Sequence, residues 1–364
     1  HFERNVLGDQ GEQGATTSLN CNPEIDKDDD NIPDNLDVEG SIDWSYCNLY
    51  ALDLSNLDLS GANLAGSSLY QADLHNTNLS GADLSHSQIY KANISNTNFK
   101  HANLSYANLC GIGTTGITSG LAEGSKHLTA FDFTGADLSY ADLDHSFLQY
   151  ADLTDAIITY TNFNAANLTR VDLSGKDLTG TILTSANLSY ANLTGVDLSG
   201  KDLTGAILTG VDLSGKDLTG TILTSADLSY ANLTGVDLSG KDLTGAILTS
   251  ADLSHANLAG SILTHSDFSY ANLTGVDLSV MDLTGYDFSG ANLTAVDLSG
   301  TDLFGKNLSG ARLTSVDLSG KDLTGAILRG ADLSYSDLTG TILTEADLTA
   351  ATLVGVDLSG KDLT

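Results

Sequence analysis

The segment Val211–Ser225 reads VDLSGKDLTGTILTS and divides into three five-residue words, each with an apolar residue at its centre. A spacing of five matches neither the 3.6-residue period of an amphipathic helix nor the two-residue period of a strand. It therefore indicates an internal repeat. Central apolar residues recur every five positions from Trp44 to Leu109 and, after an interruption, from Leu128 to Leu363.

The repeated word has the form A-[DN]-L-[ST]-x, and Ala62-Asn63-Leu64 and Ala136-Asp137-Leu138 are clean copies. Because this word recurs in a constant phase, the chain resembles the pentapeptide repeat family from about residue 42 onward. The resemblance implies an all-β fold, a right-handed quadrilateral β-helix with four words on each coil. About fifteen coils are expected, which at about 4.8 Å per coil make a rod about 70 Å long.

Each position of the word has a predicted place in such a coil. The central residue and the small residue two places before it point inward, the other three face water, and Gly or Ser relaxes the corners. The backbone of each coil pairs with its neighbours, so the apolar column is continuous. Phenylalanines occupy the central position at Phe99, Phe133, Phe163, Phe268 and Phe288 and are expected to stack in the core.

A longer period of 40 residues lies above the short one. Residues 171–210 and 211–250 differ only at Asn187 versus Asp227 and at Gly210 versus Ser250. Because eight words make two coils of the implied fold, this unit is two coils that have been duplicated.

The segment before the repeats contains an acidic loop, residues 26–37, which reads DKDDDNIPDNLD. Its spacing approaches the EF-hand pattern, in which oxygen ligands surround one calcium ion. With Asp37 in place of the usual Glu, it is more similar to the calcium loops of thrombospondin type 3 repeats and dockerins. That resemblance implies a Ca²⁺ site formed by Asp26, Asp28, Asp30, Ile32 (through its carbonyl), Asp34 and Asp37. A solvated acidic linker remains the alternative.

Composition limits the possible partners. The net charge of −32 argues against direct binding to nucleic acid or to an anionic membrane, and no apolar run approaches the roughly 20 residues of a membrane span. The histidines are scattered, and no catalytic motif or phosphate-binding loop is present. We therefore predict a protein that is not an enzyme and identify no small-molecule substrate.

Four segments are expected: an arm with the calcium loop (1–40), a first repeat run (41–109), a Gly-rich loop (110–127) and a second run (128–364). The loop leaves and re-enters the solenoid out of phase, because Leu109 and Leu128 are separated by a number that is not a multiple of five. A disulfide between Cys21 and Cys47 would join the arm to the first coil. The calcium loop, together with a chain that opens at His1, favours an extracellular or cell-surface location.

Residues 20 apart stack vertically in the implied fold, which predicts an almost unbroken ladder of aspartates on one face, from Asp177 to Asp357. In one interpretation, the repulsion within such a ladder gathers cations. In the other, each carboxylate accepts a main-chain hydrogen bond at its corner. The two interpretations are compatible. Lysines depart from the family pattern because they occupy the inward position, and we expect them to reach out toward the ladder rather than widen the coil. These are Lys176, Lys201, Lys216, Lys241, Lys306, Lys321 and Lys361.

Three functions are weighed from these features. The first is an extracellular, calcium-stabilised structural rod that assembles head to tail into a filament or surface layer, because the chain stops in mid-repeat at Thr364 and Trp44 could dock against a facing coil. The second follows from the family resemblance, which implies an acidic DNA mimic acting on a type II topoisomerase. The third is a flat-faced module that recognises glycan or mineral.

Overall fold

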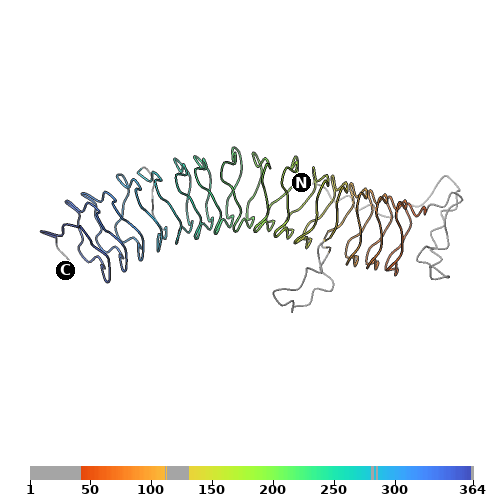
Figure 1. The fold of residues 1–364 in the computed structure, drawn as a ribbon, viewed down its shortest axis with the longest axis horizontal. Helices are drawn as coiled ribbons and strands as arrows, with labels where there is room; N and C mark the ends of the chain where they lie inside the picture. Colours follow the sequence, from red (N-terminus) through yellow and green to blue (C-terminus); the bar gives the residue numbers. More distant parts are fainter. Residues whose placement is uncertain (1–41, 111, 113–130, 280–282, 284–285, 362–364) are drawn as a thin grey trace.

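The computed structural model describes residues 42–110, 112, 131–279, 283 and 286–361. The chain winds into coils that stack side by side in sequence order along one gently curved rod (Figure 1). The regular structure of these residues consists of isolated parallel bridges and turns, without helices or longer strands. The bridges join residues 20 apart, as in Asn63 to Asp83, and recur from Asp43–Asn63 to Asp332–Thr352. A coil therefore contains four words, as the family resemblance implied.

Nearly every word in the described residues ends in the same turn. The N–H of the residue after the word donates to the carbonyl of the central residue, as from Ala186 to Leu183 at 3.1 Å, and the residue before it has a positive φ, as in a type II turn. The sequence predicted Gly or Ser at this position, but the structure also places larger residues there, including Tyr190 with a φ of 57° and Arg170 with a φ of 60°. The prediction was too narrow, because large residues adopt this φ both in words with Asp or Asn and in words without them, as Tyr160 does in the word 156–160.

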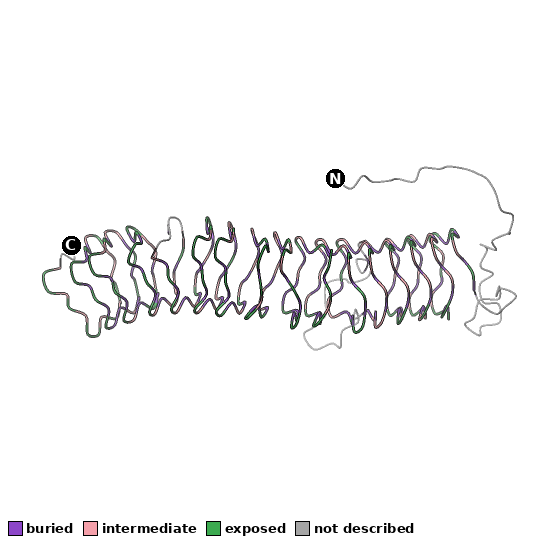
Figure 2. Ribbon diagram, turned by 90° about the horizontal axis from the view of Figure 1, so that it is seen from above, coloured by how far each residue is buried: buried purple, intermediate pink, exposed green. Residues whose placement is uncertain are grey.

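The core is one continuous column of central residues and the small residues two places before them. Buried and exposed residues alternate around every coil (Figure 2). The five central phenylalanines are at most 2 % exposed. Phe99 stacks on Phe133 with ring centroids 5.3 Å apart, and Phe268 stacks on Phe288 at 5.7 Å. The predicted core is confirmed at these positions.

Many inward-pointing hydroxyl groups bond to the main chain of the preceding coil, whereas those of Ser67 and Ser87 have no hydrogen-bond partner among the described residues. Thr77 Oγ1 donates to the carbonyl of Leu54 at 2.7 Å, and Thr221 Oγ1 donates to that of Leu198 at 2.8 Å. A buried hydroxyl without such a partner costs free energy. Ser and Thr can therefore replace Ala at the inward position without widening the coil.

The stacking register changes where the two repeat runs meet. Asn98 pairs with Asp132, a separation of 34 rather than 20 residues, so 14 extra residues lie within this coil. The core continues past the first run to Ile112, which is fully buried and accepts a hydrogen bond from Phe147 N–H at 3.0 Å. Because 34 is not a multiple of five, the predicted change of phase is confirmed.

Two predictions concern residues outside the described part of the chain. All six predicted calcium ligands, from Asp26 to Asp37, lie outside it. Cys47 is buried and disulfide-bonded, with its partner outside the described residues, so the pairing with Cys21 stays a prediction. Cys110 is a free thiol whose pKa is raised by burial and by the nearby carboxylates of Asp142 and Asp144.

Candidate functional site: an acidic face and its lysines

One side of the rod carries the predicted ladder of carboxylates. We call this the acidic face, and all of its members are exposed. Main-chain bridges join three pairs of rungs on it, Asp237–Asn257, Asp277–Asp297 and Asp317–Asp337. Its residues are Asp177, Asp197, Asp217, Asp237, Asn257, Asp277, Asp297, Asp317, Asp337 and Asp357.

Each carboxylate of this face also closes a turn. Asp217 Oδ1 accepts the main-chain N–H of Thr219 at 2.8 Å, and Asp197 Oδ1 accepts that of Ser199 at 2.8 Å. The pKa of Asp217 is lowered by the Thr219 hydroxyl and by this N–H. For Asp197 the same kinds of bonds lower the pKa although the neighbouring charge of Asp217 raises it. The aligned carboxylates and the turn bonds therefore occur together on this face.

On a neighbouring face, asparagine side chains donate hydrogen bonds to the carboxylates. Asn232 Nδ2 donates to Asp212 Oδ1 at 2.9 Å, and Asn272 Nδ2 donates to Asp252 Oδ1 at 3.0 Å. On the acidic face the corresponding bond runs from Asn257 to Asp237, at 3.0 Å. Alternating Asp with Asn replaces repulsion by a hydrogen bond, so the acidic face concentrates charge that its neighbour disperses.

The inward lysines do not reach the carboxylates, which corrects the sequence-based prediction. Lys176 Nζ donates to the carbonyl of Ala156 at 2.9 Å, and Lys216 Nζ donates to that of Val196 at 3.0 Å and also to Leu193. Lys321 and Lys361 bond in the same way to the coil before them. No ion pair of these inward lysines is found within the described residues. The main-chain carbonyls are nearer to a half-buried ammonium than any carboxylate at the outer surface.

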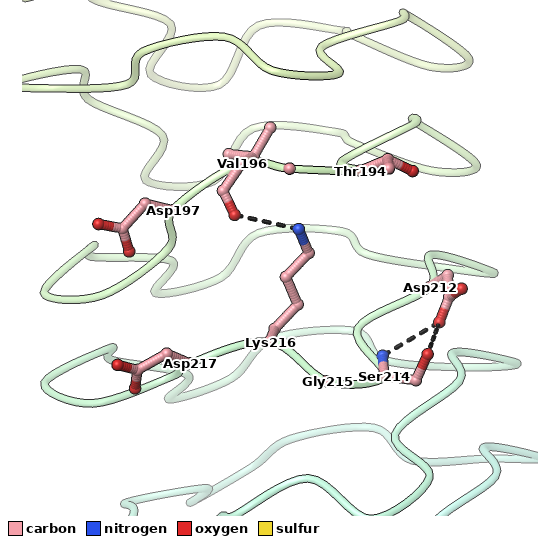
Figure 3. A pocket seen from close by; sticks show the side chains of 9 residues that line it. Thr194, Val196, Asp197, Asp212, Ser214, Gly215, Lys216 and Asp217 are labelled. Atoms are coloured by element: carbon pink, nitrogen blue, oxygen red, sulfur yellow. Dashed lines mark hydrogen bonds between the residues drawn. The ribbon is translucent and has the colours of Figure 1, made fainter.

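The lysines lie where adjacent coils are less tightly joined. A cleft of about 480 Å³ opens beside Lys216, lined by Asp197, Asp212 and Asp217 (Figure 3). Within the described residues Asp197 and Asp217 form no bridge, and Lys216 occupies the Val196 carbonyl instead. The pair Asn257–Asp277 is also unbridged without a lysine, so lysine is not the only cause. The Lys216 ammonium therefore bonds to the main chain of the preceding coil and does not reach the ladder.

The cleft recurs with the 40-residue period. An equivalent cleft of about 590 Å³ lies beside Lys176 and is lined by Asp155 and Asp172. Burial lowers the pKa of Lys176, against the opposing effect of the carboxylates of Asp155, Asp172 and Asp152. Each ammonium is engaged with carbonyl oxygens and Asp212 is bonded to the N–H and hydroxyl of Ser214. These groups hold the coils in place, and none forms an acid–base or nucleophile–base pair.

The described residues also contain no cluster of His, Cys, Asp or Glu able to hold a metal ion. Within the same part of the chain there is no helix long and apolar enough to cross a membrane.

Exposed aromatic residues were not singled out from the sequence. Tyr106, Tyr140 and Tyr160 stack at a corner with centroids 4.7 and 4.6 Å apart and planes within 2° of parallel. The signal was present as tyrosines that recur at the coil spacing, but only the fold shows that they lie at positive-φ corners and point outward.

The chain contains eight matches to the family model for pentapeptide repeats, which together span most of residues 47–344. The matches cover residues 47–86, 77–112, 132–170, 161–200, 202–240, 242–279, 271–305 and 307–344. The chain belongs to the pentapeptide repeat family, whose fold is a right-handed β-helix.

Three solved structures illustrate the likeness. HetL, a pentapeptide repeat protein involved in heterocyst differentiation regulation in the cyanobacterium Nostoc, is 28% identical, with 86% of this chain and 92% of HetL covered and a TM-score of 0.13. Full-length QnrB1, a plasmid-mediated fluoroquinolone resistance protein, is 17% identical, with coverages of 74% and 91% and a TM-score of 0.20. A thylakoid lumen protein of Arabidopsis thaliana is 25% identical, with coverages of 36% and 71% and a TM-score of 0.11. No curated protein matches the chain. At these TM-scores the neighbours carry no argument about function.

Proposed function

We propose that this protein is a non-enzymatic structural rod that acts outside the cell. The observation that carries the proposal is the continuity of the solenoid, in which bridges between residues 20 apart and one apolar column run through the described coils. A solenoid of this kind gains stability from each contact between neighbouring repeats. As a rigid rod, it would hold the molecules bound at its two ends at a fixed distance.

The polar groups support a structural role. The inward lysines bond to main-chain carbonyls, and the aspartates accept main-chain N–H groups at the turns. A catalytic site needs groups whose hydrogen bonds are free to reach a substrate. The lysines thus join one coil to the next, and the aspartates close turns within a coil.

Secretion and calcium complete the proposal. Disulfides persist in oxidising compartments, and Cys47 is disulfide-bonded. The carboxylate-rich sequence of residues 26–37 suits binding of a calcium ion at the millimolar concentrations found outside cells. Ca²⁺, held by Asp26, Asp28, Asp30, Ile32, Asp34 and Asp37, would order the segment that precedes the first coil.

We further propose that copies associate end to end into a filament or surface layer. Each coil offers the main-chain donors and acceptors that the next coil takes up, and a coil of a second copy presents the same complement. A contact between unlike ends that does not close into a ring propagates.

Electron microscopy and light scattering of the full chain, with 2 mM calcium or with a chelator, test the proposal. We expect gently curved rods in both conditions, with end-to-end chains that lengthen with protein concentration in calcium. A compact globular particle would contradict the rod itself. Monomeric rods at every concentration would contradict only the assembly.

A further inference from the structure

One corner of the rod carries a column in which tyrosines alternate with an arginine, a glycine and a serine. Its members lie 20 residues apart at the same turn position and share φ values between 57° and 67°, so their side chains leave the backbone in the same direction. We call this the tyrosine column. In chain order it comprises Tyr150, Arg170, Tyr190, Gly210, Tyr230, Ser250 and Tyr270.

The spacing of a filled column is known from another corner. Tyr106, Tyr140 and Tyr160 occupy consecutive coils, and their rings stack in parallel with centroids 4.7 and 4.6 Å apart. One coil therefore provides room for one planar group. In the tyrosine column the rings of Tyr190, Tyr230 and Tyr270 are two coils apart, or about 9 Å, which leaves room for one planar group between each pair.

The two intervening levels carry no ring of their own. Gly210 has no side chain, and Ser250 has only a hydroxymethyl group. The ring of Tyr190 leans over Gly210, because a Cβ built on that glycine would lie 2.4 Å from the ring. The room for a planar group therefore lies between this ring and that of Tyr230. Those two rings are 51% and 65% exposed, and Tyr270 is 67% exposed.

The chain itself indicates which group suits such a level. Arg170 stands one coil before Tyr190, and the carbon of its guanidinium lies 5.1 Å from the centroid of the Tyr190 ring. Tyr150 occupies the coil before Arg170. A planar cation thus lies at the level between two tyrosines of the same column, in the arrangement that favours cation–π attraction.

Aspartates lie close in sequence to Gly210 and to Ser250. Beside the first level, Asp212 follows Gly210 by two residues, and Asp227 precedes Tyr230 by three. Asp252 and Asp267 take the same places beside Ser250. At the level that Arg170 already fills, the residue equivalent to Asp227 is the neutral Asn187. The duplicated units differ at only two positions, and one of these differences adds a negative charge beside an empty level.

We propose that the levels at Gly210 and Ser250 bind guanidinium groups, and that the partner is a protein segment presenting arginines at matching intervals. Tyrosine rings on both sides would stack on the planar cation, and the flanking carboxylates would attract its charge. An ammonium lacks the planar face that stacks on a ring. A polyproline II segment repeats every three residues, or about 9 Å, which equals the separation of the two levels. This proposal is independent of the rod's location and assembly.

The probes are two fluorescent peptides, four repeats of Arg-Pro-Pro and four repeats of Lys-Pro-Pro, which carry equal charge. Binding to the full chain is measured by anisotropy at 150 mM salt. We expect the arginine peptide to bind about tenfold more tightly, the combined effect of two cation–π sites. Equal affinity of the two peptides would show only ionic attraction to an acidic rod and would overturn the proposal.

Three variants locate the site. Tyr230→Ala removes the ring shared by both levels and should abolish the preference for arginine; its backbone conformation is one that Ala295 already adopts. Ser250→Arg supplies an internal guanidinium and should weaken the arginine peptide several-fold. The matched control is Tyr335→Ala, since Tyr335 is 66% exposed at the same kind of turn but has Ser315 and Gly355 beside it and no second tyrosine in its column. An arginine preference that survives Tyr230→Ala, or is lost equally in Tyr335→Ala, would refute the assignment.

Discussion

The aspartates of the repeat word serve two roles, as turn acceptors and as charges, and Asp252 allows the two to be separated. Its Oδ1 accepts the main-chain N–H of Ser254 at 3.0 Å and the side-chain N–H of Asn272 at 3.0 Å. Asp252→Ala removes both bonds, each of which contributes about 0.5–1.5 kcal/mol net. Because both donors are partly exposed and water replaces some of the loss, we expect a destabilisation of about 1–2 kcal/mol.

Asp252→Asn should be nearly neutral, because asparagine retains the acceptor. Asn232 performs the same task one coil earlier, where it accepts the N–H of Thr234 at 3.1 Å, and Asn292 donates to Asn272 at 3.0 Å. The assay is hydrogen exchange at the Ser254 amide, which reports local opening in a solenoid better than a global melting curve does. We expect exchange to be about 5- to 30-fold faster in Asp252→Ala and unchanged in Asp252→Asn. Equal acceleration in both variants would mean that the charge, and not the turn bond, holds this coil.

Four further predictions follow from the acidic surface and the segment before it. Asp217→Asn should stabilise the rod at 10 mM salt by removing repulsion from Asp197 and Asp237, and the gain should shrink at 1 M salt, where charges are screened within about 3 Å; a gain unaffected by salt would show that repulsion is not its cause. The Thr349 hydroxyl and N–H and the Arg329 guanidinium lower the pKa of Asp347 to about 2. Its contribution to stability is therefore present above the unfolded-state pKa of about 3.9 and is lost as pH falls toward 2; acid melting curves of wild type and Asp347→Ala should converge over that window and differ at pH 5. Asp26→Ala combined with Asp28→Ala should abolish calorimetric calcium binding without changing the melting of the solenoid, and equal binding by both proteins would contradict the calcium loop. The purified rod should leave supercoiling by a type II topoisomerase unaffected, whereas stoichiometric inhibition at physiological salt would support the DNA-mimic alternative.

The repeating pattern indicated a solenoid, and the family resemblance carried by that pattern implied its four-word coil. The burial of Leu213 and of the stacked Phe99 and Phe133 confirms the predicted core. With 20 residues per coil, the sequence then placed Asp197 and Asp217 on one line of the acidic face. These properties depend on the period of the sequence together with the coil that the family resemblance implies.

The partners of the polar side chains were decided by the tertiary structure. A lysine at an inward position was expected to seek the nearest carboxylate in the pattern, but the Lys216 ammonium finds the Val196 carbonyl of the coil before it, a group with no signature in the side-chain sequence. The corner residues were likewise expected to be small, yet Tyr190 and Tyr160 adopt a positive φ there. Whether two tyrosines leave an open level between them depends on the direction in which their side chains leave the coil, and that direction is set by the three-dimensional turn. The periodicity of the sequence thus determined where each residue lies along the rod, whereas the backbone groups brought beside it by coiling determined what it contacts.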